Sequence, residues 1–328
     1  MKIGIIGPSQ SGKSTLLKVL LQAGVSGDIG VFKSADPRVD GIFEIFSSKK
    51  RTYPETTFID LGALSSFAKK DLSKLQDIDL FICVIGAVFS QDPKKDFEKL
   101  ITDIIVTDLE VVQNRIERLK KESRPDKERE SKILERYQNT LSEGKVLYKA
   151  GLDEDEIRFL SGMVFLSLKP LILAINISDN SNKTGPLEEY AKSLGIQHIY
   201  FCGKIESEVL ELEPQERNKF LKEMGIGHDL REELSKLISK KLDLITFFTT
   251  GDKETKGWYL KSGLPAIEAA GKIHSDMKRG FIRAEVVNYG DFIKCGSMHK
   301  ARERGVLKVE GKEYIVRDGD IINIRFNI

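Results

Sequence analysis

The stretch Gly7-Pro-Ser-Gln-Ser-Gly12-Lys13-Ser14-Thr15 decides the fold of this chain, because it matches G-x-x-x-x-G-K-[S/T] at every defined position. It follows an apolar strand-like run, Lys2–Ile6, and opens an apolar-periodic helix from Ser14 through Leu21. Glycines let such a loop curl until successive backbone N–H groups point at one phosphate, and the helix N-terminus adds its positive dipole end. The stretch therefore predicts a phosphate-binding loop.

The side chains of this loop have separate predicted roles. Lys13 is expected to bridge the β- and γ-phosphate oxygens, and the Ser14 hydroxyl is expected to be a ligand of Mg²⁺. A turn that only reverses the chain has no need of Lys-Ser directly after Gly12. The residues predicted to hold the phosphates are Ser9, Gln10, Ser11, Gly12, Lys13, Ser14 and Thr15.

Length and composition set the frame around this loop. The 328 residues exceed one domain of about 100–200 residues, so two or three domains are expected. The net charge of +2 indicates no polyanionic partner, and such a partner must be argued from local patches. The three isolated cysteines are typical of reduced thiols in a cytoplasmic protein, and the four scattered histidines form no metal motif. The longest apolar run, roughly Leu80–Phe89, has about half of the ~20 residues that a membrane-spanning helix needs, and no signal peptide is evident. We therefore expect a cytoplasmic protein without a membrane anchor.

Three further apolar runs, Thr57–Leu61, Leu80–Val88 and Lys169–Ile177, read as buried strands with helical patterns between them. Strands that alternate with helices predict an α/β domain with a mostly parallel sheet. One polar motif ends a strand of this kind, and a second follows another short strand. Asn176-Ile-Ser-Asp179 stands where GTPases carry N-K-x-D, and Cys202-Gly203-Lys204 stands where they carry a second base-contacting loop. The residues predicted to contact the base are Asn176, Ile177, Asp179, Cys202, Gly203 and Lys204.

The chain between about 103 and 145 predicts an antiparallel helical hairpin with its tip near Pro125. Its apolar residues recur at spacings of three and four, the stripe of an amphipathic helix or coiled coil. Between Arg115 and Lys132 the hairpin carries eight basic and five acidic residues, so it is either a solvated helix surface or a contact arm for RNA or a protein. The stripe residues are Leu109, Val112, Ile116 and Leu119, then Leu134, Tyr137 and Leu141.

From about Leu244 the pattern changes to short strand-like runs between glycine turns, which predicts a small strand-rich terminal domain. Between Lys272 and Lys308 there are nine Lys/Arg and four Asp/Glu residues with interleaved aromatic residues. This segment is either a patch for phosphate-backbone contacts or a solvated face over core aromatics. His274 is interpreted as structural. The runs are Ile245–Thr249, Ile282–Val287, Val306–Val309, Glu313–Val316 and Ile321–Phe326, and the aromatics are Phe281, Tyr289 and Phe292.

Several segments resemble the Obg-like (YchF-type) ATPases along essentially the whole chain. Asp36-Pro-Arg-Val-Asp40 and Tyr53-Pro-Glu-Thr-Thr-Phe-Ile-Asp60 are similar to that family's D-P-R-L-D and P-T-T segments, and Ile157–Pro170 is similar as well. Ile273–Val286, Gly311–Asp320 and Ile324–Ile328 resemble its TGS domain almost word for word. The resemblance implies a P-loop NTPase core at residues 1–102 and 151–243, a coiled-coil arm at 103–150 and a β-grasp-like TGS domain at 244–328.

The resemblance also implies the activity: binding of ATP with Mg²⁺, slow hydrolysis, and a role at the ribosome, with RNA or ribosome contacts through the arm and the TGS domain. The two switch loops are shorter than in the family. The first, Ala23–Ala35, lacks the Mg²⁺-binding threonine, and the second begins Asp60-Leu-Gly-Ala-Leu64. Asp60 is expected to hold a Mg²⁺-bound water. Leu64 stands at the catalytic position, where most GTPases orient the attacking water with glutamine and the family has an apolar residue.

Two questions stay open. The first is whether the chain hydrolyses the nucleotide. Short switches favour binding over hydrolysis, so the alternative to an ATPase is a non-hydrolysing, nucleotide-responsive module that docks RNA or a protein. The second question is which base the site prefers. Asp179 suits guanine, whose edge offers two N–H groups to a carboxylate, whereas adenine presents an acceptor there. The resemblance favours ATP, and GTP stays open.

Overall fold

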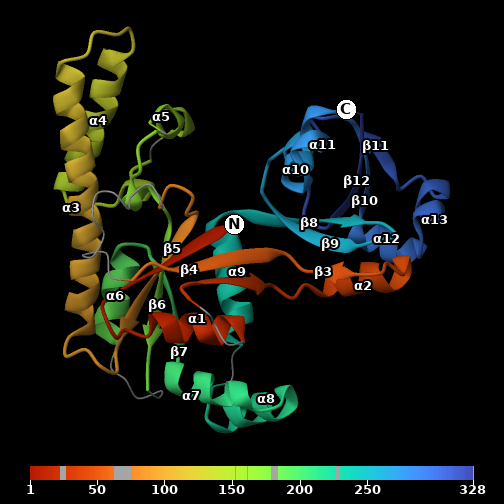
Figure 1. The fold of residues 1–328 in the computed structure, drawn as a ribbon, viewed down its shortest axis with the longest axis horizontal. Coiled ribbons are helices and arrows are strands. Elements are labelled where there is room, and N and C mark those ends of the chain that lie inside the picture. The colour runs from red at the N-terminus through yellow and green to blue at the C-terminus, as the bar shows by residue number, and fades with distance from the viewer. Residues whose placement is uncertain are drawn as a thin grey trace. The chain divides into compact units, whose positions relative to one another are not determined.

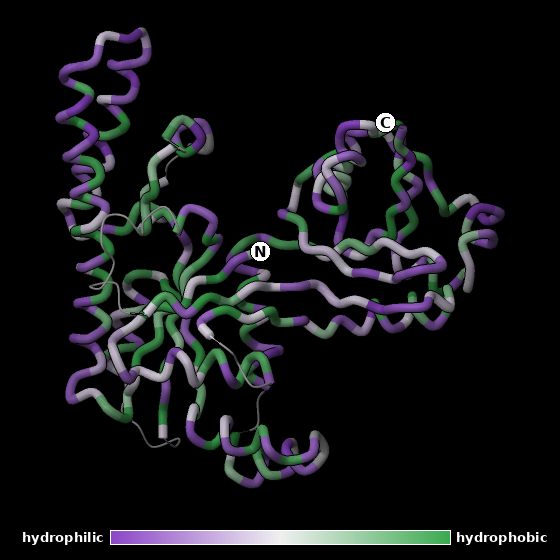
Figure 2. The backbone as a smooth tube through the Cα atoms, viewed as in Figure 1, coloured by the Kyte–Doolittle hydropathy of each residue, from purple (hydrophilic) through white to green (hydrophobic). Residues whose placement is uncertain are grey.

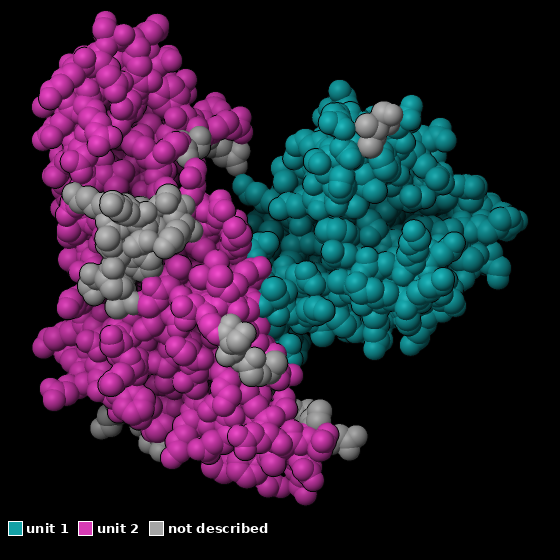
Figure 3. All heavy atoms as spheres, viewed as in Figure 1, with its two compact units in different colours: residues 1, 31–56, 231–328 teal, residues 2–30, 57–230 magenta. Residues whose placement is uncertain are grey.

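The computed structural model describes residues 1–22, 27–62, 75–151, 153–160, 162–178, 184–226 and 229–327. The chain forms two compact units, shown in different colours in Figure 3. The P-loop unit contains residues 2–30 and 57–230, and the C-terminal unit contains residues 1, 31–56 and 231–328. Residues 31–56 therefore cluster with the end of the chain, although they follow the phosphate-loop helix in sequence. The predicted domain boundaries stay a prediction.

A six-stranded sheet lies at the centre of the P-loop unit, in the order β2-β4-β1-β5-β6-β7. Pairings of β1 with β4 and β5, of β5 with β6, and of β6 with β7 are all parallel. This confirms the predicted α/β class and a strand at each of the three predicted runs, two of which are fully buried, whereas the strand at residues 55–60 is only partly buried. The strands are β1 (Lys2–Ile6), β2 (Ile29–Lys33), β4 (Glu55–Asp60), β5 (Leu80–Gly86), β6 (Leu171–Asn176) and β7 (Gln197–Phe201).

Helices cover this sheet because its central strands are apolar on both faces. Every residue of β5 and β6 is buried, as expected of a parallel sheet between helix layers. Phe81 and Cys83 share one core with the long helix α3 and with α6, and α1 contacts α7 (Figure 1). The helices of this unit are α1 (Lys13–Leu21), α3 (Pro93–Lys120), α4 (Lys127–Ser142), α5 (Glu154–Phe159), α6 (Gly185–Ser193), α7 (Gly203–Glu208) and α8 (Pro214–Glu223).

Helices α3 and α4 form the predicted antiparallel hairpin and pack side by side (Figure 1). Helix α3 begins at Pro93, before the predicted start near residue 103, because the Asp92 side chain caps it by accepting the Lys95 N–H at 3.1 Å. The predicted apolar stripe is the contact between the helices. The outer half of the hairpin is largely polar in Figure 2.

Ion pairs brace the tip of this hairpin. Glu130 is 3% exposed. It accepts from Arg115 at 2.6 Å and also pairs with Arg124. Lys127 donates to the Lys120 and Glu122 carbonyls at 3.2 and 3.0 Å, which satisfies free carbonyl groups at the end of α3. Part of the basic charge counted between Arg115 and Lys132 is therefore neutralised by ion pairs within the hairpin.

A buried carboxylate fastens α3 to the segment before β6. Asp108 is fully buried and accepts from the Leu166 N–H at 2.8 Å, the Ser167 N–H at 2.7 Å and the Ser167 hydroxyl at 2.5 Å. Leu166 and Ser167 belong to a single 3₁₀ turn, Leu166–Leu168. One side chain thus satisfies three donors that would otherwise be buried without a partner.

The C-terminal unit is built on a second sheet, in the order β11-β10-β12-β8-β9-β3. Its antiparallel β8–β9 hairpin, parallel β12–β8 pairing and helix α10 against the core agree with the predicted β-grasp-like domain. Its elements are β3 (Arg51–Thr52), β8 (Leu244–Thr250), β9 (Thr255–Lys261), β10 (Phe281–Asn288), β11 (Lys308–Glu310), β12 (Asp320–Phe326), α2 (Pro37–Phe46), α9 (Leu230–Lys241), α10 (Ala266–Ile273), α11 (Ser275–Arg279), α12 (Tyr289–Cys295) and α13 (Met298–Glu303).

One strand predicted for this unit is wrong, and two, β9 and the two-residue β3, were missed. Residues 313–316 form no strand and make only an isolated bridge between Ile315 and Pro265. The Asp320 carboxylate draws this segment into a turn, since it accepts from the Tyr314 hydroxyl at 2.8 Å and from the Arg317 N–H at 2.9 Å. Strand β9 was missed because its sequence, TKGWYLK, mixes lysines and a glycine with its apolar residues.

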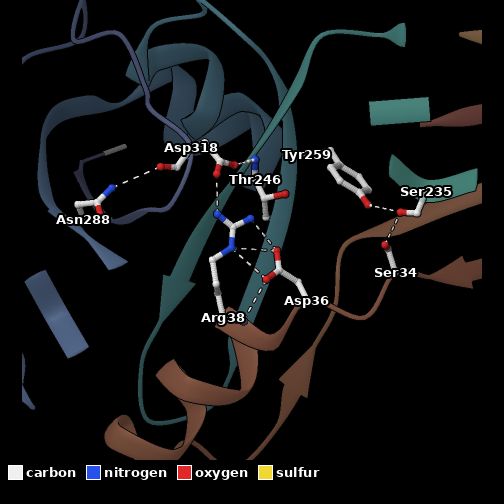
Figure 4. Close-up of polar contacts among 8 residues, drawn as sticks. All are labelled: Ser34, Asp36, Arg38, Ser235, Thr246, Tyr259, Asn288 and Asp318. Carbon is white, nitrogen blue, oxygen red and sulfur yellow. Dashed lines mark hydrogen bonds and ion pairs between the residues drawn. The ribbon is translucent and has the colours of Figure 1, made fainter. Parts of the chain in front are cut away.

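Helix α2 starts at the D-P-R segment and is fastened to a distant turn (Figure 4). Asp36 caps it by accepting the Arg38 N–H at 3.0 Å. The Arg38 guanidinium contacts both Asp36 oxygens and donates to Asp318 at 2.6 Å. Asp318 also accepts the Thr246 N–H at 2.8 Å. The Ser34 and Ser235 hydroxyls lie 2.5 Å apart beside this cluster. These contacts account for the grouping of residues 31–56 with the C-terminal unit.

Arg38→Ala is expected to loosen this attachment. The guanidinium side chain is 28% exposed, so we expect a modest loss of about 1–2 kcal/mol, from the bidentate contact and the packing over Phe248. Hydrogen exchange of residues 34–40 should rise in the variant. Arg51→Ala, in which a half-exposed arginine of the same segment loses its Asp40 partner, is the matched control and should change exchange less. Equal protection in both variants would contradict the role of Arg38.

Among the described residues, no helix combines the length and the apolar character that crossing a bilayer requires.

Candidate functional site

The loop between β1 and α1 has the backbone of a phosphate cradle. Gly7 and Gly12 adopt positive φ angles of 156° and 103°. A Cβ atom on Gly7 would lie 2.2 Å from the Val84 carbonyl oxygen, and one on Gly12 would lie 2.3 Å from Asn176 Nδ2. Both positions therefore require glycine, for conformation and for space. The Ser11 hydroxyl is buried and has no hydrogen-bond partner among the described residues, so a polar group is left over inside the cradle.

Lys13 is held over this loop. Its Nζ donates to the Gly7 carbonyl at 3.1 Å and to the Pro8 carbonyl at 2.7 Å. Burial lowers the pKa of Lys13, and the nearby Asp60 carboxylate opposes that effect. The two carbonyls are neutral acceptors, so an anionic oxygen brought to the loop would be the stronger partner for this ammonium group.

Ser14 and Asp60 form the second part of the site. The Ser14 hydroxyl, in the first turn of α1, donates to Asp60 Oδ2 at 2.8 Å at the end of β4. Asp60 Oδ1 accepts the Gly62 N–H at 3.0 Å, which fixes the carboxylate. A hydroxyl and a carboxylate side by side at a phosphate cradle are the oxygen donors that Mg²⁺ prefers, so the residues fit that ion.

Asn176 connects the phosphate loop to the second predicted motif. Its Nδ2 donates to the Ser11 carbonyl at 3.1 Å, and its Oδ1 accepts the Gly203 N–H at 3.1 Å. The Cys202 thiol lies 3.2 Å from the Ser178 carbonyl, in the motif that contains Asn176. Three segments that are far apart in sequence are thus joined by hydrogen bonds at the carboxyl ends of β1, β6 and β7, where parallel sheets bind ligands.

The described structure thus brings Gly12, Lys13, Ser14, Asp60 and Asn176 together with Cys202 and Gly203. Leu64 and Asp179 lie outside the described residues. Ser9 and Gln10 are exposed on the loop and Lys204 is exposed on α7, while Ile177 packs against the core. A Cβ on Gly203 would contact Thr15 at 3.1 Å.

Sequence reasoning missed Glu206. This residue is 5% exposed, and its Oε1 accepts the Cys202 N–H at 2.8 Å, which orders the loop at the start of α7. The signal was a glutamate five residues after a strand end, in the first turn of a helix, where a carboxylate is favoured.

The basic segment 272–308 contains structural residues. His274 caps α11, since its Nδ1 accepts the Asp276 N–H at 3.2 Å, which agrees with the structural interpretation. Phe292 is fully buried, and Phe281 and Tyr289 pack partly buried against the two cores of the C-terminal unit. The interleaved aromatics are therefore core residues.

Comparison with known proteins supports one family along the chain. The YchF-GTPase C-terminal family model, described as a protein of unknown function (DUF933), matches residues 244–327. The ribosome-binding ATPase YchF of Bacillus subtilis is 33% identical over 362 aligned positions that cover 99% of each chain. The protein of the same name from Haemophilus ducreyi is 32% identical, with 100% of this chain and 99% of its own covered.

The fold gives the same result. The structure of the Schizosaccharomyces pombe YchF GTPase superimposes with a TM-score of 0.86 over 99% of this chain and 97% of that one, at 23% identity. A phosphate loop, an inserted helical hairpin and a β-grasp-like terminal sheet thus occur in one chain that matches its relatives from end to end. The chain belongs to the YchF family.

Proposed function

We propose that this chain binds a purine nucleoside triphosphate with Mg²⁺, with ATP favoured over GTP, hydrolyses it slowly, and acts in association with the ribosome. The observation that carries the proposal is the convergence of Lys13, the Ser14–Asp60 pair and Asn176 on one glycine-shaped loop. The names of the relatives, ribosome-binding ATPases, support the choice of ATP and of the ribosome.

Each side chain has a defined task in this proposal. The loop N–H groups and the N-terminus of α1 hold the β-phosphate, and the Lys13 ammonium neutralises charge on the β- and γ-phosphates. Ser14 and Asp60 hold Mg²⁺, which supplies charge neutralisation at the phosphates when bound. Asn176 keeps the phosphate loop and the Cys202-Gly203-Lys204 loop in register, so that base and phosphate sites stay at a fixed separation.

The base preference is tested by titrating the protein with MgATP and MgGTP in a calorimeter. ATP is expected to bind more tightly. Asp179→Ala is expected to weaken GTP more than ATP if the carboxylate reads guanine N–H groups, because adenine offers no such donors to it. Ser207→Ala, at an exposed hydroxyl bonded to the Lys204 carbonyl, is the control. Equal losses for ATP and GTP would exclude base reading by Asp179.

One observation favours the second candidate, a nucleotide-responsive binding module without turnover. Helix α1 ends at Leu21 and β2 begins at Ile29, so only a short connection, without threonine, occupies the place of the first switch. Multiple-turnover phosphate release with MgATP separates the two candidates. Slow release identifies an ATPase, and tight binding without release identifies the module.

Ribosome association is proposed to use the helical arm at residues 103–150 and the TGS domain at 244–328, with the nucleotide core at 1–102 and 151–243. Co-sedimentation with purified bacterial ribosomes, with ATP and without nucleotide, tests this part. Recovery of the protein in the ribosome pellet is expected, and its absence in both states would contradict the ribosomal role while leaving nucleotide binding intact.

A further inference from the structure

One face of the C-terminal sheet is only half covered by helices. Val287 and Ile321, paired across β10 and β12, lie in a core with α2, α12 and α13. Side chains alternate between faces along a strand, so every second residue toward the start of β10 stays on this face. Those positions are polar rather than apolar. In register along β10 and β12 they are Glu285 opposite Asn323, then Arg283 opposite Arg325. On β11, the apolar Val309 lies opposite Glu285.

A single buried carboxylate organises this uncovered part. Glu285 is 9% exposed and accepts from Arg302 of α13 at 3.0 Å, from Asn323 at 3.2 Å and from Arg325 at 3.1 Å. The arginine side chains themselves remain open to solvent, with 66% of Arg302 and 53% of Arg325 exposed. We call the group of Arg283, Glu285, Arg302, Val309, Asn323 and Arg325 the open arginine face.

The charge on this face is not balanced. Three arginines and one glutamate leave a charge of +2. Glu285 pairs with Arg302 and Arg325, and Arg283 has no acidic partner in the part of the chain that the structure describes. Glu285 binds one nitrogen of Arg302 and one of Arg325, so the other N–H groups of each guanidinium fork are left for an external acceptor. Holding the forks in place lowers the side-chain entropy lost on binding.

Two apolar side chains of β10 and β11 are also exposed. Val309 is 63% exposed and Ile282, at a bulge of β10, is 60% exposed. A sheet surface with fixed, exposed guanidinium groups and short apolar side chains fits an extended anionic chain whose charged groups recur at regular intervals and each offer two oxygens to one guanidinium. Phosphodiesters have that chemistry, and arginine forks match them bidentately.

We propose that the open arginine face binds the phosphate backbone of RNA. The inference rests on the proposed ribosome association and gives it a surface on the chain. The contacts are electrostatic and independent of base sequence, so they position RNA without selecting it. An acidic protein segment is the competing occupant. It would offer carboxylates in place of phosphodiesters and would not show the salt dependence of counterion release from RNA.

The test measures binding of a fluorescein-labelled 20-nucleotide uridine RNA by anisotropy at several salt concentrations. Arg283→Gln/Arg325→Gln is expected to weaken binding on the order of tenfold and to reduce the slope of log K against log salt by about 1.4, for two lost phosphate contacts. Val309→Glu, which adds a negative charge without removing a contact to Glu285, should weaken binding in the same direction.

The matched control is Lys272→Gln/Lys308→Gln, which removes the same charge elsewhere on the unit. Lys308 pairs in register with Val286 on the opposite side of the sheet, and Lys272 lies on α10, which packs on that side. Equal losses in control and test variants would overturn the proposal, as would wild-type affinity in both arginine and Val309 variants. Binding of a polyglutamate peptide but not of RNA would assign the face to an acidic protein. Unchanged MgATP affinity in the arginine variant, with loss of RNA, separates this inference from the nucleotide-binding proposal.

Discussion

Lys13→Ala is expected to weaken MgATP binding roughly 10²–10³-fold, because charge-assisted hydrogen bonds contribute about 1.5–3 kcal/mol each and Lys13 serves two phosphates. The structure holds its ammonium group at the phosphate loop, where the Gly7 and Pro8 carbonyls are its acceptors. The variant removes a buried cation that makes these two hydrogen bonds to neutral carbonyls and interacts electrostatically with Asp60. The fold should therefore survive while the affinity is lost.

Isothermal titration calorimetry with MgATP gives this affinity directly. Lys18→Ala, an exposed lysine on the same helix α1, is the matched control and should bind as the wild type does. Thermal unfolding of both variants without nucleotide shows whether the loss is confined to binding. Wild-type affinity in Lys13→Ala would place the nucleotide somewhere other than at residues 7–15.

Asp108→Ala is expected to destabilise the P-loop unit by roughly 3–5 kcal/mol. Three donors, from Leu166 and Ser167, lose a common acceptor in a fully buried place, and each unsatisfied buried group costs about 1–3 kcal/mol. Burial raises the pKa of Asp108 to about 6, which shows that burying the charged carboxylate is itself unfavourable. Removing the carboxylate also removes this desolvation penalty, and that offsets part of the destabilisation. The cost of leaving three buried donors without an acceptor is larger than the desolvation penalty that is removed.

Chemical denaturation, together with hydrogen exchange at the Leu166 and Ser167 amides, measures this effect globally and locally. Asp103→Ala, a partly exposed aspartate of the same helix α3, is the control and should change stability little. Ser167→Ala removes one of the three donors and should cost less than Asp108→Ala. If Asp108→Ala left both amides protected as in the wild type, the carboxylate would not be what holds this segment to α3.

Local sequence information predicted the elements of the P-loop unit well. The phosphate loop follows from the positions of two glycines, Lys13 and Ser14, and the hairpin follows from apolar spacings of three and four. Both patterns are encoded within short stretches of chain. The strands of the terminal sheet were harder to predict because they are short and half buried. Strand β9 was missed, and residues 313–316 were wrongly predicted to form a strand. There the carboxylate of Asp320, rather than the local run, decides the backbone.

For the candidate site too, some residues could be predicted from local sequence and others only from the tertiary structure. The predictions of the phosphate loop, Asn176 and the loop at Cys202 came from recognisable residue types at or directly after the ends of strands, and the prediction of Asp60 came from the resemblance to the family's second switch. Tertiary structure alone showed that Asn176 bridges two of these segments and that Glu206 supports the second.

By itself, the sequence determined the phosphate loop, the alternation of strands and helices, and the helical hairpin, since each is a periodic or contiguous pattern. Only the tertiary structure decided that residues 31–56 join the C-terminal unit, where Arg38 meets Asp318 from 280 positions away. It alone decided that Asp108 accepts hydrogen bonds from Ser167, and that Arg302 and Arg325 pair with Glu285 on one sheet face. Contacts between distant residues leave no local period, because they depend on which surfaces the packed elements bring together.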